Sequence, residues 1–298
     1  MKIAQFEDNQ GYCIGVEARG KWINYSRAEV LYYLLRHGVA VEQVPTLQHY
    51  LESGEYSLAG MKQILDFVIG GDLLKHLLLG RDAVMKAPIL RPPKIVALGL
   101  NYLLHAQEGS FEVPKEPIIF VKAGSSVIGP NETVRVPRGL GRMDHEVELA
   151  VVIGKTASRV KKKSAYGFIA GYTICNDVTA RSVQTKDIER RHPWFRSKSF
   201  DTFTPLGPWM LTADEIRPPV RLPLECRVNG RIRQKANTRE LVFDIPTIIE
   251  FITKQITLEP GDIVSTGTPE GIGPIKHGDT MVCRIRQLGE LRNPVRSR

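Results

Sequence analysis

A proline-rich segment at residues 87–95 (APILRPPKI) separates two parts of the chain that have different sequence patterns. Its prolines at positions 88, 92 and 93 lack a backbone N–H, so a regular helix cannot run through the segment. Residues before it show mainly helical patterns, and residues after it show mainly strand patterns. We therefore predict an α+β chain with a small N-terminal accessory domain of α/β type at residues 1–88 and a β-rich domain at residues 89–298.

The N-terminal part is predicted to contain two short strands followed by helices. Residues 12–26 (YCIGVEARGKWINYS) indicate two strands joined by a turn at Arg19–Gly20. Ser26 is the expected N-cap of a helix that ends before Gly38, and Thr46 that of a helix that ends near Gly54. The stretches 61–71 and 72–80 continue the helical pattern. No catalytic constellation stands out in this part.

The remaining two thirds of the chain are predicted to be rich in strands. Asn229–Gly230 is a strong two-residue hairpin signal. One helix is expected after Asp177, ending at His192, and another at residues 244–255, with Asp244 as its cap. No GxGxxG or GxxxxGK[ST] motif follows a strand, which disfavours Rossmann and P-loop nucleotide binding. The expected strands lie at residues 95–100, 116–122, 146–154, 168–177, 222–230 and 281–288.

Composition argues for a cytoplasmic globular protein with reduced thiols. No apolar run approaches the ~18–20 residues that span a bilayer, and the N-terminal residues show no signal-peptide core, so no membrane association is expected. The four cysteines form no CxxC pair, which disfavours a zinc ribbon and a disulfide scaffold.

The chain carries a formal net charge of +9, with basic residues gathered at 161–163 and near the C-terminus. Such a surplus could serve a nucleic-acid partner or a small anionic substrate. No aromatic residues interleave with the basic runs. We therefore expect a solvated basic surface and no nucleic-acid partner.

An acidic strand, residues 143–154 (MDHEVELAVVIG), is the most informative stretch. Alternation along a strand places Asp144, Glu146 and Glu148 on one face, with successive residues of that face roughly 7 Å apart. The apolar run that follows predicts a core strand, in which such carboxylates need compensation. A hard divalent ion would supply it, and a solvent-facing acidic edge is the alternative. Asp177 adds a third carboxylate at a strand-to-helix junction, where helix capping is the competing interpretation.

Further polar residues could complete a site. Arg181 and Gln184 share one helix face, and His105 and Glu108 form a general-base unit if they lie on one helical turn. Residues 109–117 look like a mobile loop, which suits a lid. Lys198 lies among aromatic residues and prolines and could neutralise a developing enolate, unless it only snorkels to the surface.

These residues resemble the fumarylacetoacetate hydrolase family over roughly residues 92–295, whereas the first ninety residues match only loosely. The matching strings occur in order: LNYLLHAQE, DHEVELAVVIGK, GYTICNDVTARSVQ, KSFDTFTPLGPW, VNGRIRQ, LEPGDIVSTGTPEGIG and LGELRNPV. The family pattern does not use Asp144. Two departures, Ser182 for a common Asp and Thr204 for a common Cys, leave the substrate open.

The resemblance implies a mixed β-roll or β-sandwich catalytic domain, usually in a homodimer. It implies a divalent metal, Mg²⁺ or Mn²⁺ with Ca²⁺ as the alternative. The implied roles are metal ligation by Glu146, Glu148 and Asp177, water activation by His105 and Glu108 on a closing lid, and contacts to the substrate or its enolate by Arg181, Gln184, Lys198 and Thr268.

The activity implied is C–C bond hydrolysis of an acylpyruvate or a related 1,3-diketo acid through a metal-stabilised enolate. The full His105–Glu108 dyad favours hydrolysis. Oxaloacetate decarboxylation and isomerisation of a 2-hydroxy-dienedioate on the same scaffold remain alternatives. A basic, non-catalytic binding module is a further alternative, and it predicts salt-sensitive nucleic-acid affinity without a metal requirement.

Overall fold

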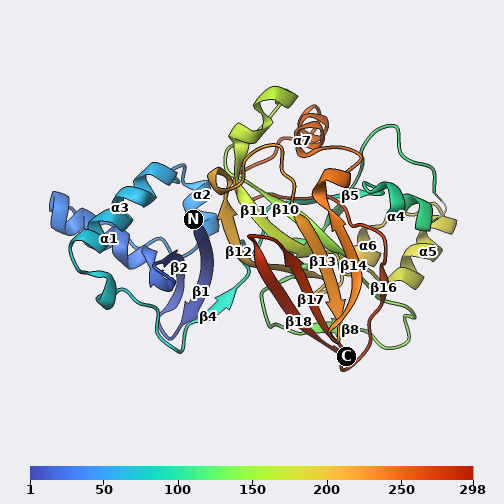
Figure 1. Ribbon diagram of the computed structural model, residues 1–298, viewed down its shortest axis with the longest axis horizontal. Helices are drawn as coiled ribbons and strands as arrows, with labels where there is room; N and C mark the ends of the chain where they lie inside the picture. Colours follow the sequence, from blue (N-terminus) through green and yellow to red (C-terminus); the bar gives the residue numbers. More distant parts are fainter. Residues whose placement is uncertain (110, 298) are drawn as a thin grey trace.

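The structure is a computed structural model that describes residues 1–109 and 111–297 (Figure 1). Its largest sheet contains eleven strands, nine of them in the order β3-β2-β1-β12-β11-β10-β15-β5-β6, while β4 pairs with β1 and β7 pairs with β12. The strands of this main sheet are β1 (Lys2–Asp8), β2 (Gly11–Ala18), β3 (Lys21–Asn24), β4 (Val84–Lys86), β5 (Ile95–Gly99), β6 (Ile118–Lys122), β7 (Val127–Ile128), β10 (Val147–Ile153), β11 (Ile169–Asn176), β12 (Thr204–Thr212) and β15 (Ile263–Ser265).

A second sheet of five strands has the order β14-β13-β17-β18-β8, and β9 and β16 form a separate pair. These strands are β8 (Val134–Val136), β9 (Asp144–His145), β13 (Pro223–Val228), β14 (Arg231–Asn237), β16 (Gly273–Pro274), β17 (Thr280–Ile285) and β18 (Gly289–Ser297). The α-helices are α1 (Tyr25–His37), α2 (Leu47–Glu52), α3 (Leu58–Gly70), α4 (Leu103–Glu108), α5 (Arg181–Glu189), α6 (Phe195–Lys198) and α7 (Ile245–Thr253).

Strand β10 connects two hydrophobic cores because its side chains alternate between the two faces of the main sheet. Val147, Leu149 and Val151 pack in a core shared with the five-stranded sheet and α7. Ala150 and Val152 pack in a second core, shared with the N-terminal strands and helices. This sandwich of mixed α and β elements confirms the predicted α+β class. None of the described helices combines the length and apolar content needed to cross a membrane.

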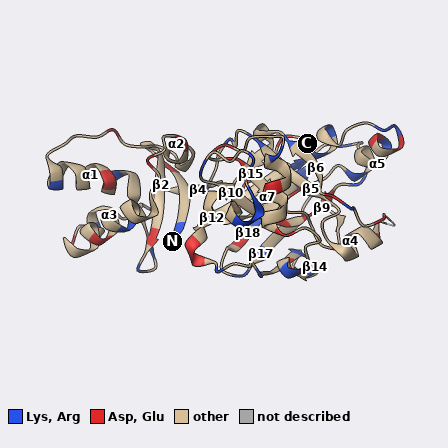
Figure 2. Cartoon of the chain, turned by 90° about the horizontal axis from the view of Figure 1, so that it is seen from above, with Lys and Arg blue, Asp and Glu red and all other residues tan. Residues whose placement is uncertain are grey.

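The N-terminal unit is joined to the rest of the fold by a strand that the sequence analysis missed. Strand β1 pairs antiparallel with β12, with Lys2 opposite Leu211 and Ile3 opposite Met210. The main sheet therefore runs across the predicted boundary at residue 88, although α1 and α3 lie together at one end of the molecule (Figure 1 and Figure 2). The division into two domains stays a prediction.

Two local predictions for the N-terminal helices are wrong. Asn24, and not Ser26, caps α1, because its side chain accepts a hydrogen bond from the backbone N–H of Arg27 at 3.0 Å. Ser26 is buried instead and donates to the carbonyl of Val44 at 2.6 Å. The helix expected at residues 72–80 is reduced to the single 3₁₀ turn Leu74–His76.

The other caps and turns follow the sequence. Gly38 ends α1 with a φ of +69°, and Thr46 caps α2. Asp244 caps α7. Asn229 and Gly230 both have positive φ, as a tight hairpin turn requires. The six predicted strands of the C-terminal part are all present, and the four cysteines are free and buried.

Helix α5 is shorter than predicted at both ends. It begins at Arg181 and ends at Glu189, before His192. Residues 178–180 stay extended because Thr179 exchanges two backbone hydrogen bonds with Asp144, at 2.9 and 3.0 Å. Asp177 therefore does not cap the helix, and its side chain is free for another role.

Candidate active site

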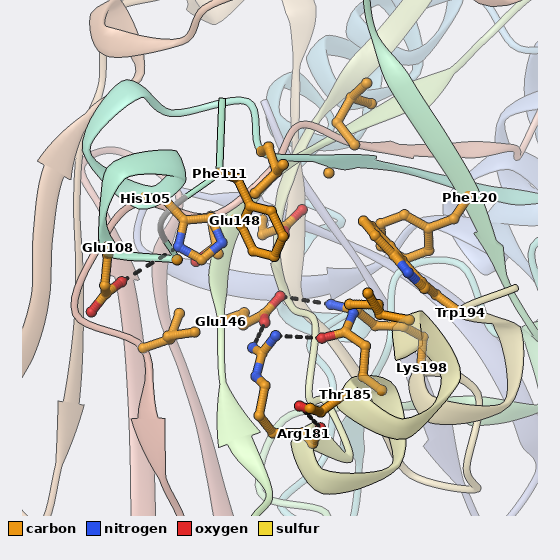
Figure 3. Close-up of a pocket in the computed structure, with 18 of the residues that line it drawn as sticks. His105, Glu108, Phe111, Phe120, Glu146, Glu148, Arg181, Thr185, Trp194 and Lys198 are labelled. Carbon is orange, nitrogen blue, oxygen red and sulfur yellow. Dashed lines mark hydrogen bonds and ion pairs between the residues drawn. The ribbon is translucent and has the colours of Figure 1, made fainter. Parts of the chain in front are cut away.

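A cavity of about 330 Å³ lies where the ends of β5 and β6, the start of β10 and the helices α4, α5 and α6 meet (Figure 3). Charged residues of its lining include Glu146, Glu148, Arg181 and Lys198. Apolar residues of its lining include Phe111, Phe120, Ile188 and Trp194. A cavity lined by apolar side chains and a few charged groups is typical of a site for a small ligand.

Three carboxylates converge at the base of this cavity, and two of them, Glu146 and Glu148, line it directly. Glu146, Glu148 and Asp177 each offer an oxygen within 4.8 Å of the others, and they are 3%, 1% and 0% exposed. Glu146 and Glu148 share a face by strand alternation. The pairing of β10 with β11 brings Asp177 beside Glu146, and the backbone N–H of Asp177 donates to the backbone carbonyl of Glu146 at 2.8 Å. The predicted grouping is confirmed, and the alternative of a solvent-facing acidic edge is wrong.

Lys198 lies between two of these carboxylates. Its Nζ donates to Glu146 Oε2 at 2.7 Å and to Asp177 Oδ2 at 2.6 Å. The side chain is only 3% exposed, so it does not snorkel to the surface. The ammonium also lies 5.0 Å from the centre of the Phe120 ring. Lys198 can therefore balance negative charge inside the cavity.

A second buried lysine, which the sequence analysis missed, supports the same cluster. Lys122 Nζ contacts Asp177 Oδ1 at 2.5 Å and donates to the backbone carbonyls of Lys198 and Phe203. Its position at the end of the apolar strand β6 was the available signal, because a lysine that becomes buried at such a position needs an anionic partner.

Arg181 and Gln184 face the acidic cluster from α5. The Arg181 guanidinium donates to Gln184 Oε1 at 2.5 Å and also bonds Glu146. Through Nε it donates to Asp144 Oδ2 at 2.8 Å. Asp144 is buried but bound by arginines, so it lies outside the carboxylate triad.

His105 and Glu108 reach the cavity from α4. Their closest side-chain atoms, Nδ1 and Oε2, lie 3.5 Å apart, and the backbone N–H of Gly271 donates to Glu108 at 3.1 Å. The predicted pair is therefore present, with the His105 side chain 14% exposed and that of Glu108 38% exposed. Residue 110 of the predicted lid lies outside the described residues, and lid movement stays a prediction.

Thr268 lines the cavity with its hydroxyl already engaged. Its Oγ1 accepts from Gln234 Nε2 at 2.8 Å and donates to the carbonyl of Val147 at 3.1 Å. The residue is 4% exposed. Its implied contact with the substrate carboxylate or with a metal-bound oxygen stays a prediction.

The buried carboxylates differ in their electrostatic environment. Burial opposes ionisation of Glu146, but Lys198 and Arg181 outweigh it and hold the pKa of this carboxyl below its ordinary value. Burial, with Asp177 and Glu146 nearby, raises the pKa of Glu148 to about 8. One member of the triad is therefore charged at neutral pH, while another tends to hold its proton.

The cluster fits a hard divalent cation. All three donors are carboxylates, the ligand type that Mg²⁺ and Mn²⁺ prefer. Glu148 is oriented by Ser265 Oγ at 2.6 Å and by the Gly267 N–H at 2.9 Å, and both bonds fall on the same oxygen, Oε2. Such outer hydrogen bonds commonly fix a metal-ligating carboxylate. The triad could therefore hold a divalent metal, whose identity the donors leave open.

Metal binding is expected to release a proton, because Glu148, with a pKa of about 8, must lose its proton before it can ligate a cation. Below that pH, the apparent affinity for Mg²⁺ should therefore rise about tenfold per pH unit, and it should level off above it. Isothermal titration calorimetry in two buffers of different ionisation enthalpy would measure the number of protons released when Mg²⁺ binds. Heats that do not depend on the buffer, with an affinity that does not depend on pH, would contradict this assignment.

The chain is similar to known proteins over most of its length. A family model described as fumarylacetoacetate (FAA) hydrolase C-terminal matches residues 94–296. The chain is 41% identical over 256 residues to a mitochondrial oxaloacetate tautomerase of Xenopus laevis, a match covering 84% of this chain and 78% of the relative.

Two solved structures are similar over the full chain. A 5-carboxymethyl-2-hydroxymuconate delta-isomerase from Mycobacterium smegmatis has a TM-score of 0.73 and 33% identity, covering 100% of this chain and 99% of that one. A maleylpyruvate hydrolase from Sphingobium sp. SYK-6, in complex with manganese(II) and pyruvate, has a TM-score of 0.76 and 31% identity, with the same coverage. Since the family model alone matches more than half of the residues, the chain belongs to the fumarylacetoacetate hydrolase family of enzymes.

Proposed function

We propose that this protein is a divalent-metal-dependent enzyme that enolises a small anionic 2-oxo acid, with keto–enol tautomerisation of an oxaloacetate-like compound as its reaction. The observation that carries the proposal is the convergence of three buried carboxylates with Lys198 beside one small cavity. Similarity to an oxaloacetate tautomerase supports the choice of reaction. The predicted homodimer is part of this proposal.

The bound divalent ion would polarise the 2-oxo and carboxylate oxygens of the substrate and lower the cost of enolate formation. Lys198 and Arg181 supply fixed positive charge beside the triad, where negative charge grows on the substrate. The apolar side chains in the cavity lining would lower the local dielectric constant and so strengthen these interactions.

His105 is the proposed proton carrier. In the tautomer that has its hydrogen on Nδ1, this atom donates to Glu108, and the lone pair on Nε2 is left for the substrate. Nε2 would then remove a proton from the carbon next to the 2-oxo group and deliver it to the enolate oxygen, which gives the enol; the reverse transfer from oxygen to carbon gives the keto form. Glu108 stabilises the imidazolium that forms between these steps.

Hydrolysis of an acylpyruvate, the reaction predicted from the sequence, is the second candidate. The His105–Glu108 pair favours it, because the same Nε2 could take a proton from water instead of carbon. The similar maleylpyruvate hydrolase structure supports this alternative. Decarboxylation and dienedioate isomerisation would use the same enolate.

A substrate panel with Mg²⁺ and with Mn²⁺ would separate these reactions. Oxaloacetate, acetylpyruvate, fumarylpyruvate and a 2-hydroxy-dienedioate would each be followed by ultraviolet absorbance and by release of carbon dioxide. Tautomerisation changes the enol absorbance of oxaloacetate without releasing carbon dioxide, whereas hydrolysis destroys the diketone. No turnover of any compound with either metal would refute the proposed function.

Replacing His105 with alanine should slow turnover by roughly 10²-fold or more, the usual contribution of a positioned base, while metal affinity stays within about twofold of the original. His76, in the 3₁₀ turn outside the cavity, offers a matched histidine-to-alanine control. Turnover and Mg²⁺ titration on both variants would check this. Unchanged turnover in the His105 variant would remove this residue from the chemistry.

A further inference from the structure

Arg142 also lines the cavity. It lies two residues before β9, and its side chain is 48% exposed. Its backbone is fixed to the first turn of α5, because its N–H donates to Ser182 Oγ at 2.8 Å and the Ser182 N–H donates to its carbonyl at 3.2 Å. Its main chain is therefore positioned by the same helix that carries Arg181 and Gln184.

The close approach of this loop to α5 depends on Gly141. Its φ is +82°, and a Cβ at this position would lie 2.4 Å from Ser182 Oγ. Ser182 is one of the two departures from the family pattern noted in the sequence, and here its hydroxyl accepts the Arg142 N–H. Ser182 thus helps to position Arg142, and it lies outside the carboxylate triad.

One buried carboxylate holds Arg142 and Arg181 together. Asp144 is fully buried, and its Oδ1 accepts from Arg142 Nε at 2.6 Å while its Oδ2 accepts from Arg181 Nε at 2.8 Å. The first bond uses only Nε of Arg142. The two terminal nitrogens of that guanidinium do not take part in it and remain suited to a paired contact with a carboxylate.

We infer that Arg142 binds the distal carboxylate of the substrate, so that the site selects 2-oxo acids carrying a second acidic group. This inference rests on the proposed function. The substrate head would lie at the triad with Lys198 and Arg181, and its far end would reach the partly exposed guanidinium of Arg142. Asp144 and Ser182 are positioning residues in this arrangement, since they act through Arg142.

Binding of two inert ligands tests the inference without turnover. 2-Oxoglutarate and pyruvate share the 2-oxo acid head, and only the first has a distal carboxylate. Isothermal titration with Mg²⁺ present should show tighter binding of 2-oxoglutarate. Arg142→Gln should raise its dissociation constant by about tenfold or more, the usual size of a charge-assisted contact, and leave that of pyruvate within about twofold. The dissociation constant of 2-oxoglutarate for Arg142→Lys should lie between those of the unaltered protein and Arg142→Gln. Arg138 is an exposed arginine on the same loop, so Arg138→Gln is the charge-matched control.

Kinetics provide the second measurement. Arg142→Gln should raise KM for oxaloacetate with little change in kcat, and it should leave KM for the 4-methyl ester of oxaloacetate unaltered. Equal effects on the dianionic and monoanionic compounds would overturn the inference and give Arg142 a structural role. Equal affinity of the unaltered protein for 2-oxoglutarate and pyruvate would also overturn it. Absence of all turnover with selective binding intact would refute the proposed reaction alone.

Discussion

Replacing Glu148 with glutamine should lower metal-dependent turnover by at least ~10³-fold, because several kcal/mol of charge stabilisation depend on the metal and each 1.36 kcal/mol is a factor of ten. The substitution preserves shape and keeps an acceptor for Ser265 and Gly267. It also removes the carboxyl group whose pKa burial raises, so folding should be retained. Metal content, Mg²⁺ titration and turnover would be measured on the same preparation.

Ser265→Ala is a milder variant that perturbs the same carboxylate. It removes one hydrogen bond from Glu148 Oε2 but leaves the carboxylate in place. Loss of such an outer contact typically lowers metal affinity by about 10–100-fold. Added Mg²⁺ should therefore restore the turnover of the Ser265→Ala variant and fail to restore that of the Glu148→Gln variant. Full activity of Glu148→Gln at its original metal content would disprove ligation by this residue.

Lys198→Met should lower kcat by about 10²–10³-fold, the usual cost of losing a group placed to stabilise developing negative charge. It should also lower Tm in the absence of metal, because Glu146 and Asp177 lose the buried ammonium that bridges them. Saturating Mg²⁺ would supply positive charge at the same carboxylates. The Tm difference should then shrink while the kcat defect persists, as thermal unfolding and kinetics with and without Mg²⁺ would show.

Lys94→Met is the matched control for this lysine. Lys94 pairs with buried Asp262 at 2.8 Å, outside the residues that line the cavity. Its loss should lower Tm without a selective effect on kcat, and Mg²⁺ should not restore the loss. If Mg²⁺ restored kcat of Lys198→Met together with its Tm, the role of Lys198 would be structural.

The acidic cluster could be predicted from sequence because its members sit on strongly patterned strands. Alternation places Glu146 and Glu148 on a common face, and helical spacing does the same for Arg181 and Gln184. These two relations depend on local geometry, so a single sequence carries them. Asp177 is assigned to the cluster from its strand-to-helix junction and the family resemblance, and the tertiary pairing of β10 with β11 is what brings it beside Glu146.

Other contacts depend on tertiary structure and could not be predicted. Lys122 reaches Asp177 across 55 positions of the chain, and no local pattern encodes that distance. The bond between Arg142 and α5 depends on Ser182 facing a loop 40 positions earlier. Helix α5 was predicted too long because Thr179 pairs with Asp144 and not with its own helix. In each case a long-range partner overrides or adds to the local preference.

The pairing of β1 with β12 limits how freely the N-terminal unit can be replaced by that of a relative. Only β12 separates β1 from β11, the strand that ends beside Asp177. A fragment starting after the proline segment would expose a bare strand edge and the apolar surface that Ile3 and Ile14 now cover. A transplanted unit from a relative would therefore have to recreate this edge pairing, whereas its outer helices could diverge without disturbing the catalytic half.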